Sequence, residues 1–339
     1  MTTISPYQGG YSTRPSPVYA SNKSVYAAAP ASSVTPQQIS DKALLAQYQP
    51  VLLMNPLDDP PVAIEDLLKV STLKKYLHGG KAITLIDRPT LNALKYYNAP
   101  NYFLSFSTPG VQNALKQGAF KPTIYGKVIE TPHFKALYYL YYFPQSGLSL
   151  SEVFQETPAR ELPQWVQKPV SAVLNRFPIT AHEGDVEGSM VFLQKHTLKP
   201  TGMLVLQHFK GQSVLWKDIQ QIQNHPAIRL RPFSHATDVL KDKNNIPSLR
   251  TIHPDLKPIG PDNDLILTWR GRIGDFRRLP WLYERGENLL ATELLPSVTG
   301  GYRGPGAGHV TPWEVSLALN AVRQPEKAFY HYLDPNPKA

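Results

Sequence analysis

The sequence predicts a mostly β fold, with a β-sandwich core, short peripheral helices and a C-terminal helix. Of the 339 residues, 33 are proline and 21 are glycine, a content that favours many turns and argues against an all-helical bundle. From Gly126 onward the chain contains segments dense in Tyr, Leu and Phe, which suit the pleated surface of a half-buried sheet. The hydrophobic fraction of 42% is typical of a globular chain with a large core.

Composition divides the chain into three parts. Residues 1–40 contain two charged residues, Arg14 and Lys23, and are otherwise mostly small or polar. Such a segment buries too little apolar surface to offset the entropy of ordering, so it is predicted to be a disordered tail or an export leader, with a plain flexible terminus as the alternative. Residues 41–325 are expected to form a single β-sandwich domain with helical insertions, and residues 326–339 a C-terminal tail.

Helices are predicted at four places. Apolar residues near helical spacing predict a helix over 64–77, ended by Gly79-Gly80. Further short helices are predicted over 90–97 and after Thr108, with Pro109 in the first turn. The capping box Thr311-Pro312-Trp313-Glu314 begins a C-terminal helix that should run to about Arg323.

Strands are predicted mainly in the second half of the chain. The segment 134–143 forms the first, and Pro144-Gln145-Ser146-Gly147 is predicted to close it as a turn. Further strands are predicted over 188–194, 203–209, 228–233 and 265–269. The polar, proline-rich stretch 237–263 is predicted to be a loop.

Several function classes are excluded by what the chain lacks. There is no cysteine, which rules out disulfides, zinc–thiolate sites and cysteine nucleophiles. The net charge of +9 would attract an anionic membrane or nucleic acid, although the basic residues are scattered and a mildly positive soluble surface is the alternative. No nucleic-acid-binding signature is present, so a membrane lipid head group or a host surface is the expected partner, and nucleic acid is not.

Localisation follows from the N-terminus and the apolar segments. The most apolar stretch, 136–143, is too short to span a bilayer. The N-terminus lacks a charged segment followed by an apolar one, so it is not a cleavable secretory signal. The chain is therefore expected to be secreted by a route that needs no such signal, or otherwise to be cytoplasmic.

The segment Ala181-His182-Glu183-Gly184-Asp185-Val186-Glu187-Gly188 places one imidazole and three carboxylates in six residues just before a predicted strand. Because side chains alternate along a strand, Asp185 and Glu187 should share one face. Val186, Met190 and Phe192 should point the other way, into a core. Three residues separate His182 from Asp185, and a bend at Gly184 would bring the imidazole round to the carboxylates.

Carboxylate oxygens with a single imidazole nitrogen suit a hard divalent cation, Mg²⁺, Ca²⁺ or Mn²⁺, better than a closed zinc site. We therefore predict a cation site at His182, Asp185 and Glu187. A solvated acidic turn is the alternative. If the site is hydrolytic, Glu183 is the candidate general base on a metal-bound water.

The remaining candidate is a basic patch. Four arginines surround one predicted turn and form a candidate anion-binding patch: Arg270, Arg272, Arg277 and Arg278. A solvated hairpin is the alternative reading of the same residues.

Several motifs resemble, in order, a vacuolar-protein-sorting-associated family whose hallmark is an HEGDWE segment. The run from Leu44 to Leu52 resembles the family's opening, and Tyr138-Tyr139-Leu140-Tyr141-Tyr142-Phe143-Pro144 its aromatic strand. The segment 182–187 resembles the hallmark itself. Ser234-His235-Ala236 and Gly271-Arg272-Ile273-Gly274-Asp275 match its later motifs.

The aromatic strand followed by H-x-x-D-x-E is also similar to the necrosis- and ethylene-inducing cytolysins, with their GHRHDWE heptapeptide. That resemblance implies a β-sandwich toxin that holds a divalent cation and recognises sphingolipid head groups of plant membranes. It carries the metal role to His182, Asp185 and Glu187. Val186 replaces the tryptophan expected between Asp185 and Glu187, and Ile273 the one expected in the GRWG-like segment of the vacuolar-protein-sorting-associated family. Leu174-Asn175 occupy the region where the cytolysins carry an aspartate. A further ligand, or a residue that orients the ligands, would therefore be His235, His208 or Asp275.

Three functions follow as hypotheses. The first is a membrane-directed toxin or effector that uses the cation to recognise a lipid or glycan head group. The second is a metal-dependent hydrolase of phosphoesters or esters, and the third is a non-enzymatic trafficking or interaction module. The sequence leaves enzymatic activity open and favours its absence.

Overall fold

The computed structural model describes residues 39–56, 58–77, 82–99, 101–106, 108–149, 178–206, 211–232, 235–240, 249–273, 302–303 and 324–333. The chain divides into two compact units, Met1–Gln38 and Ile39–Ala339. The predicted tail or leader lies almost entirely in the first unit, outside the described residues. The second unit is mostly β, as the sequence predicts.

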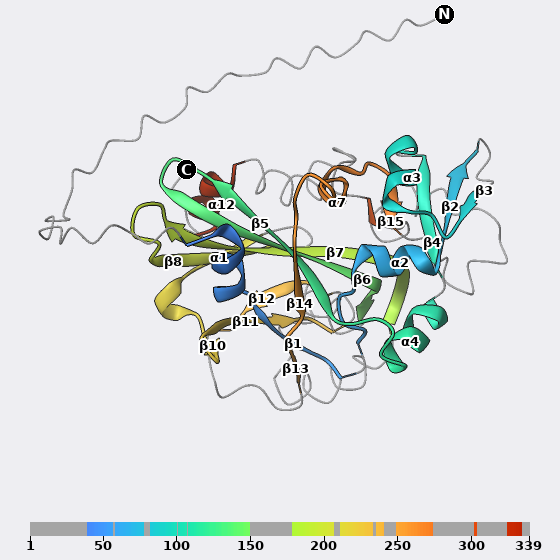
Figure 1. The fold of residues 1–339 in the computed structure, drawn as a ribbon. Helices are drawn as coiled ribbons and strands as arrows, with labels where there is room; N and C mark the ends of the chain where they lie inside the picture. The colour runs from blue at the N-terminus through green and yellow to red at the C-terminus, as the bar shows by residue number, and fades with distance from the viewer. Residues whose placement is uncertain are drawn as a thin grey trace, which may run out of the picture. The chain divides into compact units, whose positions relative to one another are not determined.

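A six-stranded sheet lies at the centre of this unit (Figure 1). Its strands, in spatial order, are β14 (Asp255–Pro258), β5 (Thr123–Glu130), β6 (Phe134–Ser149), β7 (Pro178–Gln194), β8 (Pro200–Leu206) and β9 (Gly211–Leu215). Neighbouring strands are antiparallel except β14 and β5. The long β6–β7 ladder forms the middle of the sheet.

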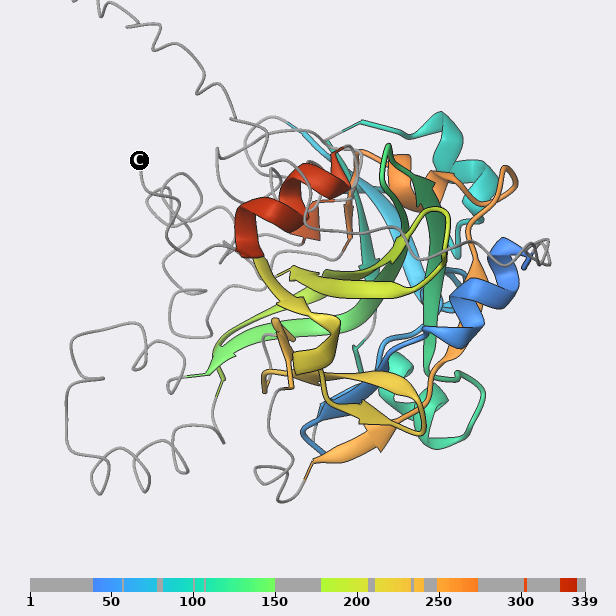
Figure 2. The ribbon, with the colours of Figure 1, turned by 90° about the vertical axis from the view of Figure 1, so that its left-hand side faces the viewer.

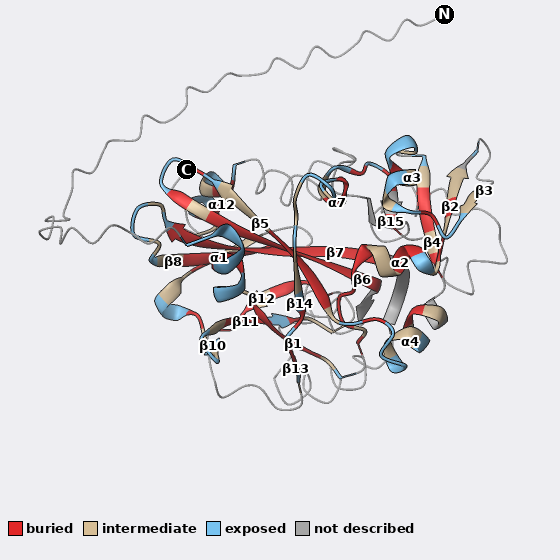
Figure 3. Cartoon of the chain, viewed as in Figure 1, coloured by how far each residue is buried: buried red, intermediate tan, exposed pale blue. Residues whose placement is uncertain are grey.

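Both faces of the central sheet are covered. Residues 136–144 of β6 are all buried, which is why the sequence there is a continuous apolar run rather than an alternating one (Figure 3). Odd-numbered side chains such as Tyr139, Tyr141 and Phe143 pack into one hydrophobic cluster, here called the first core. Even-numbered ones such as Tyr138 and Tyr142 pack into another, the second core.

A five-stranded sheet covers the first core. It comprises β10 (Gln221–Ile222), β11 (His225–Leu230), β1 (Val51–Met54), β13 (Arg250–Ile252) and β12 (Thr237–Val239), which pairs with β11. Helix α1 (Asp41–Gln47) precedes β1 in the chain, and the short helix η3 (Trp216–Asp218) precedes β10. They contribute Leu44 and Trp216 to the first core. Facing sheets with a shared apolar interior give the predicted sandwich.

A third sheet and several short helices border the second core. The sheet order is β16 (Tyr302–Arg303), β15 (Arg272–Ile273), β4 (Tyr102–Phe106), β2 (Ser71–Tyr76) and β3 (Ala82–Asp87). The helices are α2 (Ile64–Lys69), α3 (Leu91–Tyr96), α4 (Thr108–Lys116), α7 (Leu265–Thr268) and α12 (Pro325–Leu333). None of the helices in the described part of the chain is long and apolar enough to span a membrane.

Two of the helices begin where the sequence predicts them. The side chain of Thr90 caps α3 by accepting a hydrogen bond from the backbone N–H of Ala93. Helix α4 begins at Thr108 with Pro109 in its first turn, where the missing N–H of proline costs no hydrogen bond.

The turn predicted at residues 144–147 is wrong, because β6 continues through it to Ser149. The carbonyl of Tyr142 accepts a hydrogen bond from the N–H of Val62, so even-numbered residues here direct their backbone polar groups away from β7. The missing N–H of Pro144 therefore falls on the side without a β7 partner, and the ladder loses no bond.

Three other element predictions are also wrong. The helix predicted over 64–77 ends at Lys69, and the next residues form β2, which pairs with strands on both sides. The strand predicted over 265–269 is the single helical turn α7, since four apolar residues have no resolvable period. The loop predicted over 237–263 contains β12, β13 and β14, whose ladders form only with strands distant in sequence.

A helix that the sequence does not predict lies near the C-terminus. The predicted helix over 311–323 lies outside the described residues, whereas residues 325–333, expected to belong largely to a tail, form α12. Figure 2 shows α12 beside β8 and β9. Its Phe329 is fully buried and stacks on Phe192 with ring centroids 4.4 Å apart.

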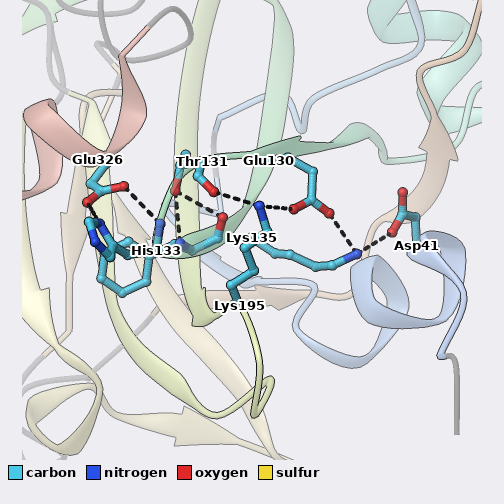
Figure 4. Close-up of polar contacts among 8 residues, drawn as sticks. Asp41, Glu130, Thr131, His133, Lys135, Lys195 and Glu326 are labelled. Atoms are coloured by element: carbon cyan, nitrogen blue, oxygen red, sulfur yellow. Dashed lines mark hydrogen bonds and ion pairs between the residues drawn. The ribbon is translucent and has the colours of Figure 1, made fainter. Parts of the chain in front are cut away.

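A polar network joins α12 to the turn between β5 and β6 (Figure 4). His133 Nδ1 lies 2.5 Å from Glu326 Oε1. On the other side of the turn, Lys135 forms ion pairs with Glu130 at 2.9 Å and with Asp41 of α1 at 3.3 Å. Polar contacts thus attach two terminal helices to the same hairpin.

Glu326→Gln is expected to destabilise the protein slightly and in a pH-dependent way. Burial raises the pKa of Glu326, but hydrogen bonds from His133 and Thr131 outweigh it and leave the pKa below its ordinary value of 4.5. A carboxyl group whose pKa is lowered by folding stabilises the folded state at pH values above its ordinary pKa. This stabilisation is lost as the pH falls through the lowered pKa of the folded state. Urea unfolding should show a loss of less than about 1 kcal/mol at neutral pH, disappearing below pH 4.5. A loss that persists in acid would contradict this account.

Candidate metal centre

Strand β7 places two acidic side chains inside the protein. The exposed fraction is 0% for Asp185 and 5% for Glu187. Asp185 pairs with Phe143 and Glu187 with Tyr141, so both carboxylates share the face of β7 that borders the first core. The predicted shared face is confirmed, and a solvated acidic turn does not describe these two residues.

The opposite face of β7 also matches its prediction. Three apolar side chains of the strand belong to the second core: Val186, Met190 and Phe192. The carboxylates are therefore buried between two packed layers. An ionised carboxylate in such a place needs compensating positive charge or hydrogen bonds.

Gly184 has a backbone conformation that favours glycine, with φ +74°. A Cβ at this position would lie 2.2 Å from the carbonyl oxygen of Ile273, so the glycine also allows β15 to approach β7. The pairing between β7 and β6 does not shift register at Gly184, because Glu183 pairs with Gln145 before it and Asp185 with Phe143 after it. The positive φ is the feature that the structure shows at Gly184, whereas the predicted bend that brings His182 to the carboxylates stays a prediction.

His182 lies in β7, where its backbone pairs with Ser146. Strict alternation would place its side chain on the face opposite Asp185, and the positive φ of Gly184 lies between the two residues. The side chains of His182 and Glu183 lie outside the described residues. Both the ligand role of His182 and the general-base role of Glu183 thus stay predictions.

His235 is brought to Asp185 by the connection between β11 and β12. Its Nδ1 lies 3.4 Å from Oδ2 of Asp185, and its exposed fraction is 2%. The imidazole stacks on the ring of Phe143, with centroids 4.0 Å apart and planes 4° from parallel. His235 has φ +56°, and its backbone N–H donates a hydrogen bond to the carbonyl of Arg231. Packing and backbone together hold the ring beside the carboxylate.

Two tyrosines lie near Glu187. Burial raises the pKa of the Tyr138 hydroxyl, and the negative charge of Glu187 raises it further. Burial also raises the pKa of Tyr141, whose hydroxyl is 2.5 Å from Ser189 Oγ. Both hydroxyls are therefore protonated at neutral pH and add no negative charge beside Glu187.

The chemistry of the donors fits a hard divalent cation, but the described residues supply an incomplete set. Within the described ranges, no three His, Asp or Glu side chains gather closely enough to hold a metal ion. Asp185 and His235 form a pair of neighbouring donors, with Glu187 on the same face. A complete site requires His182 or a residue outside these ranges.

Other predicted site residues are not brought together by the described part of the chain. His208, Asp275, Arg277 and Arg278 lie outside it, and the side chain of Arg272 does as well. Arg270 is exposed and directs its backbone N–H to Asn98 Oδ1. The arginine patch and the hydrolase hypothesis therefore stay predictions.

Sequence reasoning missed the aromatic side of the site. Phe143, which stacks on His235, was assigned only to a strand, and the contact between Gly184 and Ile273 was not foreseen. Their partners lie about ninety residues away in the chain, so no local pattern indicates them. The only local signal was Gly184 itself, a glycine inside a strand, which often marks a close approach of backbones.

Comparison with known proteins gives limited results. No family model matches the chain, and no curated protein does. The resemblance to the vacuolar-protein-sorting-associated family is therefore unsupported.

Solved structures that are similar to this chain include those of necrosis- and ethylene-inducing proteins. Necrosis and ethylene inducing protein 2 from the causal agent of cocoa's witches' broom disease is 15% identical, with 65% of this chain and 74% of that chain covered and a TM-score of 0.34. The non-toxic HaNLP3 protein is also 15% identical, with 66% of this chain and 77% of that chain covered and a TM-score of 0.35. NLPPya in complex with glucosamine is 11% identical, with 40% of this chain and 50% of that chain covered and a TM-score of 0.27.

These proteins belong to the cytolysin group that the sequence resembles through its H-x-x-D-x-E segment. With TM-scores of 0.27 to 0.35 and identities of 11% to 15%, the likeness carries no argument about activity.

Proposed function

We propose that this protein is a membrane-directed toxin or effector, in which a divalent cation held at His182, Asp185 and Glu187 recognises a lipid or glycan head group. One observation carries the proposal. Asp185 and Glu187 share a buried face of β7, and the imidazole of His235 lies 3.4 Å from Asp185.

The argument for a cation is electrostatic. Two carboxylates on one face of a strand, two residues apart, repel each other when both are ionised, and burial strengthens that repulsion. A divalent cation between them offsets the repulsion and accepts oxygen donors that are already placed together. Hard cations such as Mg²⁺, Ca²⁺ and Mn²⁺ prefer this donor type.

His235 is proposed as a positioning residue or a further ligand. Its ring is fixed by stacking on Phe143, so it restrains the orientation of the Asp185 carboxylate. A cation held by these residues would supply a positive centre that attracts the oxygen atoms of a sugar or phosphate head group. The net charge of +9 favours approach to an anionic membrane.

Asp185→Asn is the variant that tests this function. Asparagine keeps the shape of the side chain and its Oδ1 acceptor, which receives the N–H of Val186, but removes the charge. We expect the protein to release dye from vesicles made of plant plasma-membrane lipids, and we expect chelator or Asp185→Asn to reduce release at least about tenfold. Vesicle leakage is the measurement, with folding checked by circular dichroism.

Asp58→Asn is the matched control, since Asp58 is another buried acidic residue, remote in sequence from β7. It should release dye like the parent protein. Leakage that is equal with and without chelator, or equal in the parent and Asp185→Asn, would contradict the proposal. Glucosamine and mannosamine serve as the first soluble competitors, because each is present in a structure of NLPPya.

A further inference from the structure

The β2–β3 hairpin exposes large apolar side chains. Large hydrophobic side chains are exposed at five positions in the described ranges, and three of them lie on this hairpin or the helix that follows it. The exposed fractions are 40% for Leu77, 43% for Ile83 and 80% for Tyr96. Clustered exposed apolar side chains, unlike scattered ones, indicate a contact surface.

The exposed residues extend the core-facing side of the third sheet. Leu73 is fully buried in the second core, and Lys75 and Leu77 follow it at the alternation that keeps one face of a strand. Ile83 pairs directly with Lys75 across the hairpin, and Tyr102 of β4 pairs with Lys75 on the other side. One continuous face thus runs from the core to the exposed end of the hairpin.

Basic and aromatic groups border this apolar strip. The ammonium of Lys75 lies 5.9 Å from the centre of the Tyr102 ring, and Tyr97 packs edge-on against Tyr102 with centroids 5.3 Å apart. Tyr96 is the neighbour of Tyr97 at the end of α3. Tyrosine and lysine side chains with apolar bodies and polar tips are enriched where proteins meet the head groups of a bilayer.

We propose that the hairpin formed by β2 and β3, together with the end of α3, is a shallow membrane anchor. Leu77 and Ile83 enter the interface of an anionic bilayer, while Lys75 contacts lipid phosphates. This anchor is separate from the cation site on β7 and does not depend on it. It would hold the protein at the membrane surface before a head group is recognised.

Charge favours an anionic bilayer as the occupant of this surface. β3 is the terminal strand of its sheet and has no buried residue along its length (Figure 3). A second copy could also pair with this edge, and the labelling experiment below distinguishes it from a bilayer. Lys74 and Lys75 of β2 lie beside the exposed apolar side chains, and an anionic surface attracts such lysines at about 1 kcal/mol each.

A single cysteine can report insertion, because the chain contains none. Leu77→Cys, labelled with a fluorophore that brightens in apolar surroundings, should brighten and shift to the blue on mixed phosphatidylcholine and phosphatidylserine vesicles, but not on phosphatidylcholine alone. Ile39→Cys is the matched control, since Ile39 is similarly exposed and lies beside α1. Equal responses at the two positions, or no response at Leu77, would overturn the anchor. A response that needs no vesicles but rises with protein concentration would identify a second copy as the occupant and would also overturn it.

Vesicle sedimentation measures the energetic contribution of the hairpin. We expect Lys75→Gln to weaken binding about fivefold, the factor that corresponds to about 1 kcal/mol. Adding Ile83→Ser should bring the loss to roughly twentyfold. The paired control, Lys42→Gln with Ile39→Ser, should bind like the parent. Losses of equal size in both pairs would overturn the proposal.

The anchor and the cation site can fail separately. Sedimentation should be insensitive to chelator and to Asp185→Asn, whereas leakage should depend on both. Chelator-sensitive sedimentation would overturn the independent anchor, and chelator-insensitive leakage would overturn the proposed function.

Discussion

Gly184→Ala is expected to lower the free energy of unfolding by roughly 2 to 5 kcal/mol. Two physical effects combine at this position. The φ of +74° is unfavourable for any residue with a Cβ, and the added methyl group would lie 2.2 Å from a backbone oxygen of Ile273. A backbone atom cannot move aside as a side-chain end can, so β7 and β15 must separate. Urea unfolding at neutral pH measures the loss.

Two other glycines separate these effects. Gly118 has φ +70° with open space around it, so Gly118→Ala should cost only about 1 to 2 kcal/mol. Gly260 has neither constraint, and Gly260→Ala should change stability by less than about 1 kcal/mol. If Gly184→Ala costs no more than Gly118→Ala, the close approach of β7 and β15 is not present in solution.

Phe329→Ala is expected to destabilise the protein by roughly 3 to 5 kcal/mol. Phe329 is fully buried and stacks on Phe192, with Phe134 packed edge-on at 6.1 Å. It also lies against Gly202 of β8, where a Cβ would be 2.8 Å from the ring. Removing the ring leaves a cavity between α12 and the central sheet. Chemical unfolding measures the loss, and faster proteolysis near the C-terminus should accompany it.

Tyr330→Ala is the control on the same helix. Its side chain is exposed and touches Phe134 only at a tilted angle, with centroids 6.1 Å apart. Its substitution should therefore cost less than about 1 kcal/mol. Similar losses for Tyr330→Ala and Phe329→Ala would show that α12 is held by helix propensity rather than by the buried ring.

The sequence predicted those parts of the fold that local chemistry determines. The apolar run 134–143 and the alternation at Val186, Met190 and Phe192 indicate buried strands because burial itself selects such side chains. Thr90 and Thr108-Pro109 indicate helix starts because capping acts within one turn. The shared face of Asp185 and Glu187 follows from the period of a strand alone.

The sequence did not predict features that depend on distant partners. Pro144 looks like a turn residue, and only the position of Val62 shows that its missing N–H costs nothing. The apolar residues of β2 are spaced as in a helix, but the segment forms a strand because its pairing with β3 and β4 outweighs the local preference for a helix. His235 was a candidate for a place beside the ligands, but no local motif specifies the β11–β12 pairing that brings it to Asp185.

Metal content of the purified protein, measured after dialysis against each of Mg²⁺, Ca²⁺ and Mn²⁺, tests the central claim most directly. The cation site predicts about one bound ion per chain for the parent and for Asp58→Asn, and a large loss for Asp185→Asn. Bound metal that is equal in the parent and Asp185→Asn, or the absence of bound metal in both, would contradict a cation site on β7.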